Sequence, residues 1–141
     1  LGDVYKRQDY IFTAEAKSIP LIHEMARQSG AAKYFIARKG AKAYMPDPIH
    51  VEDHSITTAG TQKLFLGRDD ADLIRGKRIL IMDDVISTGG SLKAMEALVQ
   101  EAGGVVTGKV AVLAEGDAAD RTDIKFLKKL PLFNADGTVK D

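Results

Sequence analysis

Two adjacent acidic residues, Asp83 and Asp84, are the side chains of this sequence best suited to chemistry. They end an apolar run, Ile79–Met82, and stand three residues before a segment of hydroxyl groups and glycines, Ser87–Ser91. Glycines let a ligand approach the backbone closely, and the free N–H groups that open a helix favour an anion. The segment therefore suits a molecule with a phosphate at one end and a diol close by, such as a ribose 5-phosphate.

Two secondary-structure elements must hold these groups in place. The run Ile79–Met82 is typical of a buried strand, and it ends at the acid pair. Beyond the glycines, an apolar stripe with helical spacing runs from Leu92 to Ala102 and stops at Gly103. Ligands of open α/β sheets bind beyond the carboxyl ends of the strands, so this strand, loop and helix are arranged as a binding site would be.

The rest of the chain repeats the alternation of strands and helices. Strands are expected at 10–13, 34–37, 105–114 and 131–133, and helices at 18–29 and 120–130. Ser18 and Gly30 fit as the N-cap and C-cap of the first helix. Residues 45–66 contain two prolines and a turn, which indicates a long mobile hairpin or flap. The pattern predicts an α/β fold with a mainly parallel sheet and helices on both faces.

Competing phosphate-binding motifs fit the sequence poorly. A Walker pattern at Gly76 and Lys77 would need glycine in place of Ala71 and a hydroxyl residue in place of Arg78. No G-x-G-x-x-G follows an expected strand, and the acid cluster of a receiver domain needs no glycine-rich loop. The purely structural interpretation is that the acids end a strand and the glycines form a turn. The order of strand, acid pair, loop and helix favours a binding site over it.

Composition excludes several classes of protein. The 141 residues, 45% apolar and 28% charged, are enough for one globular domain with a core. Lys and Arg number 20, as do Asp and Glu, so no long-range attraction favours nucleic acid or a membrane surface. There is no Cys, hence no disulfide, thiolate zinc site or cysteine nucleophile, which fits a cytoplasmic location. No apolar run approaches the ~20 residues of a membrane span.

The segment Ile79–Ser91 resembles, at every key position, the phosphoribosyl pyrophosphate (PRPP) motif of type I phosphoribosyltransferases. The resemblance extends over about residues 10–133 and is nearest to the adenine and xanthine enzymes. It implies that Asp83 and Asp84 are catalytic, holding the ribose hydroxyls and steadying an oxocarbenium-like centre. The 5-phosphate of PRPP would bind Ser87, Thr88, Gly89, Gly90 and Ser91. The implied cofactor is Mg²⁺, held mainly through substrate oxygens and water with no direct protein ligand.

Two basic segments acquire a role from the resemblance. Lys17 lies in a segment that resembles the family's pyrophosphate loop, where a basic residue often follows Glu-Ala. Arg38, Lys39 and Lys42 match the family's R-K-x-x-K segment, and three cations in five residues suit a pyrophosphate leaving group. For Lys17, and more so for Lys42, an ordinary solvated charge is the competing interpretation.

The flap at 45–66 corresponds to a family loop that closes over the site and excludes water. Many adenine phosphoribosyltransferases carry a glutamate there as a candidate general acid or base. This chain has Thr57 at about that place, so the sequence does not identify the general acid or base. Glu52, Asp53 and His54 are nearby substitutes that a loop would normally leave solvated. Residues 115–117 either help to frame the purine or form a solvated loop.

The resemblance implies a magnesium-dependent pentosyltransferase that moves 5-phosphoribosyl from PRPP to a purine in purine salvage. Adenine is the first expectation for the base, giving AMP and pyrophosphate. The alternative is a non-catalytic regulator of the same fold that senses PRPP or nucleotides. Relatives are commonly dimers, so a homodimer is expected. Residues 1–8 are interpreted as a foreign or disordered stretch, and residues 9–141 as a phosphoribosyltransferase domain that lacks its N-terminal hood segment.

Overall fold

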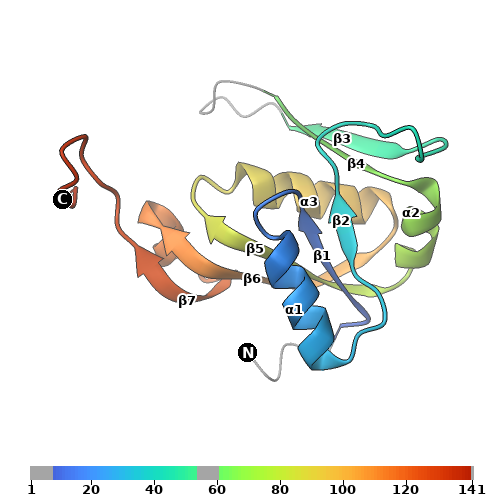
Figure 1. Cartoon of the computed structure of the whole chain (residues 1–141), viewed down its shortest axis with the longest axis horizontal. Helices are drawn as coiled ribbons and strands as arrows, with labels where there is room; N and C mark the ends of the chain where they lie inside the picture. Colours follow the sequence, from blue (N-terminus) through green and yellow to red (C-terminus); the bar gives the residue numbers. More distant parts are fainter. Residues whose placement is uncertain (1–7, 54–60, 141) are drawn as a thin grey trace.

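A computed structural model describes residues 8–53 and 61–140 of the chain (Figure 1). Five strands of this described part form one parallel sheet in the order β2-β1-β5-β6-β7. Their bounds are Tyr10–Ala14 for β1, Phe35–Ala37 for β2, Arg78–Ile86 for β5, Val105–Glu115 for β6 and Lys125–Leu130 for β7. The expected α/β fold with a mainly parallel sheet is confirmed.

Helices cover both faces of the sheet, as the alternation predicted. They are α1 (Ile19–Ser29), α2 (Arg68–Ile74) and α3 (Gly90–Glu101), with a short 3-10 turn η1 (Gly116–Asp120). Leu80 and Met82 belong to the apolar cluster under α1, whereas Ile79 and Ile81 belong to the cluster under α3 (Figure 1). Successive side chains of a strand point to opposite faces, so β5 is buried on both sides and its carboxyl end is held firmly.

The acid pair lies within β5 rather than after it. The strand was expected to stop at Met82, but it continues through Asp83 and Asp84 to Ile86. Pairing with β6 explains the extension, because Asp83 lies opposite Ala111 and Ile86 opposite Ala114. Strand pairing therefore overrides the poor strand propensity of aspartate.

The ends of α1 fit the expected caps only in part. Gly30 follows the helix with a φ of 72°, in the left-handed region that suits a glycine C-cap. Ser18 occupies the N-cap position, yet its side chain makes no capping hydrogen bond. The hydroxyl is used elsewhere, on the acid pair of β5.

The expected hairpin is confirmed in its two arms. β3 (Ile49–Asp53) and β4 (Gln62–Leu66) form an antiparallel pair, with Ile49 opposite Leu66. Leu64 and Leu66 are at most 1% exposed and join the apolar cluster that contains the α3 side chains. The turn, with Thr57 and His54, lies outside the described residues, and closure of the flap stays a prediction.

The C-terminal part differs from the expectation. The helix expected at 120–130 is wrong: the chain ends η1 at Asp120 and then forms β7, which pairs with β6. Ile124 is 5% exposed and Phe126 packs against the core, so docking on the sheet decides the local conformation. The strand expected at 131–133 is reduced to one bridge between Phe133 and Val139.

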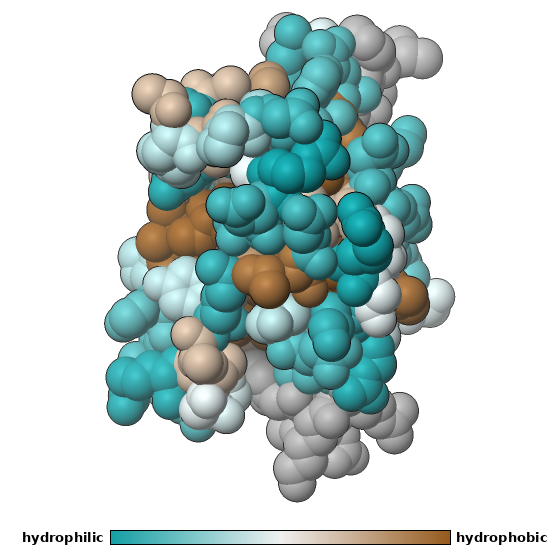
Figure 2. Space-filling view, turned by 90° about the vertical axis from the view of Figure 1, so that its right-hand side faces the viewer, coloured by the Kyte–Doolittle hydropathy of each residue, from teal (hydrophilic) through white to brown (hydrophobic). Residues whose placement is uncertain are grey.

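Polar residues dominate the side of the molecule that carries α2, with apolar residues gathered at mid-height (Figure 2). Leu73 of α2 is 43% exposed. Within residues 8–53 and 61–140, no helix has the length and apolar character needed to cross a bilayer.

Candidate active site

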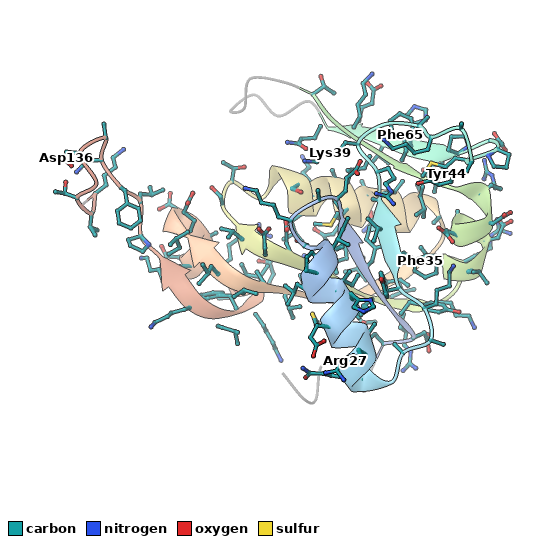
Figure 3. The ribbon with its side chains drawn as sticks, viewed as in Figure 1. Arg27, Phe35, Lys39, Tyr44, Phe65 and Asp136 are labelled. Atoms are coloured by element: carbon teal, nitrogen blue, oxygen red, sulfur yellow. The ribbon has the colours of Figure 1, made fainter. Side chains whose placement is uncertain are left out.

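The loops after β1, β2 and β5 meet at one edge of the sheet. The three strands are parallel, so their carboxyl ends lie together, which is the edge where ligands bind in such sheets. A cleft of about 230 Å³ lies there. Lys39, just beyond β2, marks this edge in Figure 3. Five residues predicted from the sequence line the cleft: Lys17, Lys39, Asp83, Asp84 and Ser91.

A buried hydroxyl organises the two carboxylates. Ser18 is 1% exposed, and its Oγ donates to Asp83 Oδ1 at 2.9 Å. The same Oγ accepts a hydrogen bond from the N–H of Asp84 at 3.0 Å. That N–H also donates to Asp83 Oδ1 at 2.9 Å. Asp83 is therefore fixed by two donors, and the loop before α1 is tied to the end of β5.

The acid pair titrates unevenly. Burial of Asp83, followed by its hydrogen bond to Asp84, raises the pKa of Asp83 to about 6. Burial also raises the pKa of Asp84, but hydrogen bonds to Asp83 and to backbone N–H groups, with the charge of Lys17, outweigh it and lower that pKa. Near neutral pH Asp84 is ionised, whereas Asp83 takes up a proton as the pH falls toward 6.

The glycine loop leads directly into α3. Gly89 is the N-cap residue, with a φ of 84° that an L side chain would adopt only under strain. The first-turn N–H groups of α3 and the positive end of its dipole therefore face the loop, which favours an anion. Ser87 donates its hydroxyl to Glu115 Oε1 at 2.9 Å, so this side chain is already engaged by the end of β6.

Glu15 holds the two cations that follow β2. Its Oε1 accepts the backbone N–H of Lys39 at 2.7 Å, and its Oε2 accepts Arg38 Nη1 at 3.2 Å. The hydrogen bond from Lys39, opposed by burial and supported by Arg38 and Lys42, lowers the pKa of Glu15. Arg38 also forms a two-way backbone bridge with Phe65 of β4, so the hairpin is fastened to the same cations.

The remaining candidates divide around the cleft. Arg38 and Lys42 are not among its lining residues, although both charges act on Glu15, which does line it. The cleft lining also leaves out four residues of the glycine loop, Ser87, Thr88, Gly89 and Gly90. Ser91, which follows them, does line the cleft.

Of the substitute acids and bases of the flap, the structure places the side chain of Glu52, which stands apart from the cleft. Glu52 pairs with Lys63 across the hairpin at 3.0 Å. Glu52 does not line the cleft, and the backbone of Asp53 lies opposite Gln62. His54 lies outside the described residues.

Sequence reasoning missed two residues of the site, Ser18 and Glu15. Ser18 was interpreted as a helix cap, because a serine before a helix usually has that role. Its position after the basic residue of the pyrophosphate-loop segment was the available signal. Glu15 stands two residues before Lys17, and an acid next to a cation-rich site is easily taken for a solvated charge.

A magnesium ion fits the donor set at the cleft only if it shares its ligands with a substrate. Among residues 8–53 and 61–140, no three His, Cys, Asp or Glu side chains are grouped to hold a metal. Asp83 and Asp84 offer carboxylate oxygens, which Mg²⁺ prefers. The ion would then complete its coordination with phosphate oxygens and water.

Comparison with known families identifies the arrangement. The family described as the phosphoribosyl transferase domain matches residues 3–137. The chain belongs to this family. The crystal structure of adenine phosphoribosyltransferase from Thermoanaerobacter pseudethanolicus superposes with a TM-score of 0.72 at 26% identity, covering 87% of this chain and 71% of that one. The expected type I phosphoribosyltransferase fold is thus confirmed.

Curated phosphoribosyltransferases are similar in sequence over most of the chain. Adenine phosphoribosyltransferase of Corynebacterium jeikeium is 36% identical over 128 residues, which are 91% of this chain and 58% of that protein. Hypoxanthine/guanine phosphoribosyltransferase of Methanocella paludicola is 35% identical over 109 residues, 77% of this chain and 53% of that protein. The chain spans little more than half the length of these relatives.

Proposed function

We propose that the chain transfers 5-phosphoribosyl from PRPP to a purine, adenine first, and releases pyrophosphate. The observation that carries the proposal is the cleft in which Lys17 and Lys39, the acid pair and Ser91 meet. Separate parts of the sequence supply these groups, and each suits a different part of PRPP. The similarity to adenine and to hypoxanthine/guanine phosphoribosyltransferases favours a purine as acceptor and purine salvage as the setting.

In this reaction the bond from ribose C1 to a pyrophosphate oxygen breaks, and a bond to a purine ring nitrogen forms as that nitrogen gives its proton to the pyrophosphate leaving group or to water. Positive charge develops at C1 on the way. The ionised Asp84 stabilises that charge and orients the ribose hydroxyls with Asp83. Lys17 and Lys39, with Arg38 held by Glu15, neutralise the departing pyrophosphate.

Magnesium, when bound with PRPP, supplies further charge neutralisation for the pyrophosphate group. Asp83 and Asp84 are the residues that would hold it. Ser18 orients the carboxylate of Asp83, and both acids line the cleft.

The test is a turnover assay with PRPP, Mg²⁺ and each of adenine, hypoxanthine, guanine and xanthine, followed by release of pyrophosphate. Nucleotide should form, fastest with adenine. Replacing both Asp83 and Asp84 by Asn should lower kcat by about 100-fold or more, the scale of a lost electrostatic contact to developing charge.

The matched control is the adjacent pair Asp69 and Asp70, replaced by Asn in the same way. These side chains lie at the start of α2, away from the cleft, and turnover should be unchanged. Absence of nucleotide with every purine would overturn the enzymatic proposal. Tight PRPP binding without turnover would instead favour the regulator.

A further inference from the structure

A group of four charged residues lies beside the glycine loop, where Arg121 approaches Gly89. Lys109 of β6 donates to Glu96 of α3 at 2.9 Å and to Asp123 at 3.1 Å. Arg121 donates to the same Asp123 from Nε at 2.9 Å and from Nη2 at 2.6 Å. Two cations and two acids thus join α3, β6 and the turn after η1.

Arg121 directs its third nitrogen at the loop. Nη1 lies 2.7 Å from the point that a Cβ on Gly89 would occupy, so the guanidinium approaches the loop backbone more closely than any side chain there would allow. No described residue accepts a hydrogen bond from Nη1. The Arg121 side chain is 33% exposed, which leaves Nη1 able to meet a ligand.

The loop itself offers no positive side chain to a phosphate. The segment 87–91 contains only serine, threonine and glycine. Its neighbour Glu115 brings a carboxylate, which accepts the Ser87 hydroxyl and would repel a phosphate dianion. A guanidinium beside Gly89 offsets that repulsion and adds a charge-assisted donor to the backbone N–H groups.

We propose that Arg121 binds the 5-phosphate of the ribosyl substrate through Nη1, as a second ligand beside the glycine loop. This inference rests on the proposed function, because it assumes that a sugar phosphate occupies the loop. The bidentate pair with Asp123 holds the guanidinium in place before the ligand arrives, which lowers the ordering cost of binding. Lys109 continues to balance the charge of Asp123 when Nη1 of Arg121 binds phosphate.

The experiment measures binding of two probes, ribose 5-phosphate and magnesium pyrophosphate, by calorimetry on the whole chain. Arg121→Ala should weaken ribose 5-phosphate by about 10-fold, the effect of one charge-assisted hydrogen bond, and leave pyrophosphate unchanged. Arg121→Lys keeps the charge but loses the planar fork, so its loss should be smaller. If the alanine variant does not fold, Arg121→Gln, which keeps one amide donor, replaces it.

Arg27→Ala is the matched control. Arg27 forms the same bidentate contact, with Glu24, on the far end of α1 from Lys39 (Figure 3). Its removal should leave both probes unaffected. Equal ribose 5-phosphate binding by wild type and the Arg121 variants would overturn the role of Arg121 alone. Equal loss of both probes would show general damage and also overturn it. A wild-type chain that binds ribose 5-phosphate but turns over no purine would refute only the enzymatic proposal.

Discussion

Ser18 joins the two residues of the acid pair, although it carries no charge. Its hydroxyl donates to Asp83 Oδ1 at 2.9 Å, lies 3.4 Å from Asp84 Oδ1, and accepts a hydrogen bond from the backbone N–H of Asp84. At 1% exposure no water competes for these bonds. Burial raises the pKa of Asp83 although the hydrogen bond from Ser18 lowers it. At Asp84 burial also raises the pKa, but hydrogen bonds to Asp83 and to backbone N–H groups outweigh it, and the two pKa values separate.

Asp83→Asn should make the protein more stable at pH 7 while it lowers turnover. The folded state raises the pKa of Asp83 from 3.8 to about 6, so its favourable contribution is complete below pH 3.8 and is lost as the pH rises through 6. The variant has no charge to bury. Its advantage in the free energy of unfolding should be near zero at pH 4 and about 1–2 kcal/mol at pH 7.

Urea denaturation of both proteins between pH 4 and pH 8 measures this difference. Asp72→Asn is the control, since Asp72 is an exposed carboxylate paired with Arg75. It should change stability by less than about 0.5 kcal/mol at every pH. A gap between Asp83→Asn and wild type that stays constant with pH would contradict the assigned titration.

At the residue scale, the sequence predicted the site residues that stand out by their charge and spacing. It missed the residues whose role depends on contacts made only in the folded protein. The acid pair and Lys39 were found because charge and spacing mark them, and both line the cleft. Glu15 and Ser18 were not found, because their roles arise from strands that meet only in the folded sheet. Ser18 is 65 residues from Asp83 in sequence, beyond the reach of any local pattern.

Among the elements, the hairpin links the core to the basic segment that follows β2. β4 buries Leu64 in the core and, one residue later, exchanges two backbone hydrogen bonds with Arg38 through Phe65. Side chains of successive strand residues alternate, so the buried face of β4 fixes the register of that bridge. Any loosening of the hairpin should therefore reach Arg38.

Leu64→Ala tests this connection. Removing a fully buried leucine side chain should lower the free energy of unfolding by about 2–5 kcal/mol. The amides of Arg38 and Phe65 donate in the bridge. In the variant their exchange with deuterium should speed up relative to the wild type, and by more than the exchange of the β5 amides does. Leu73→Ala, at a leucine 43% exposed on α2, should change neither quantity appreciably. If Leu64→Ala destabilised the protein without changing the exchange of the Arg38 amide, the hairpin core would not be linked to the site through this bridge.

Elements were predictable where apolar periodicity is strong and unpredictable where pairing decides. β5 follows from a continuous apolar run and α3 from an apolar stripe with helical spacing, and both patterns agree with the observed burial. Residues 125–130 have three lysines and three apolar residues, a composition compatible with an exposed helix. Only the edge of β6 makes them a strand, and that edge is not visible in the local sequence.

Across the whole molecule, a net charge of zero conceals a local gathering of cations. Net charge is zero, yet Lys17, Lys39, Arg38 and Lys42 gather at one edge of the sheet. Glu15, Asp83 and Asp84 lie among them at the cleft, and further acids stand elsewhere, for example Asp69 and Asp70 at the start of α2. Because opposite charges are spread over the surface, folding should depend little on salt, whereas an anionic ligand at the cleft should bind less tightly as salt rises.

Thermal unfolding with and without PRPP and Mg²⁺ tests whether the cations at the cleft act on an anionic ligand. A ligand at 100 times its Kd adds about 2.7 kcal/mol to the free energy of unfolding. For a domain of this size the Tm should then rise by roughly 5–10 °C. Raising NaCl from about 0.05 M to about 0.5 M shortens the screening length and should reduce the ligand-induced rise, while the Tm of the free protein changes little. Replacing Lys17 and Lys39 by Met should reduce the rise at low salt and remove most of its salt dependence. A ligand-induced rise that is insensitive to salt in both proteins would mean that the gathered cations do not act on the ligand.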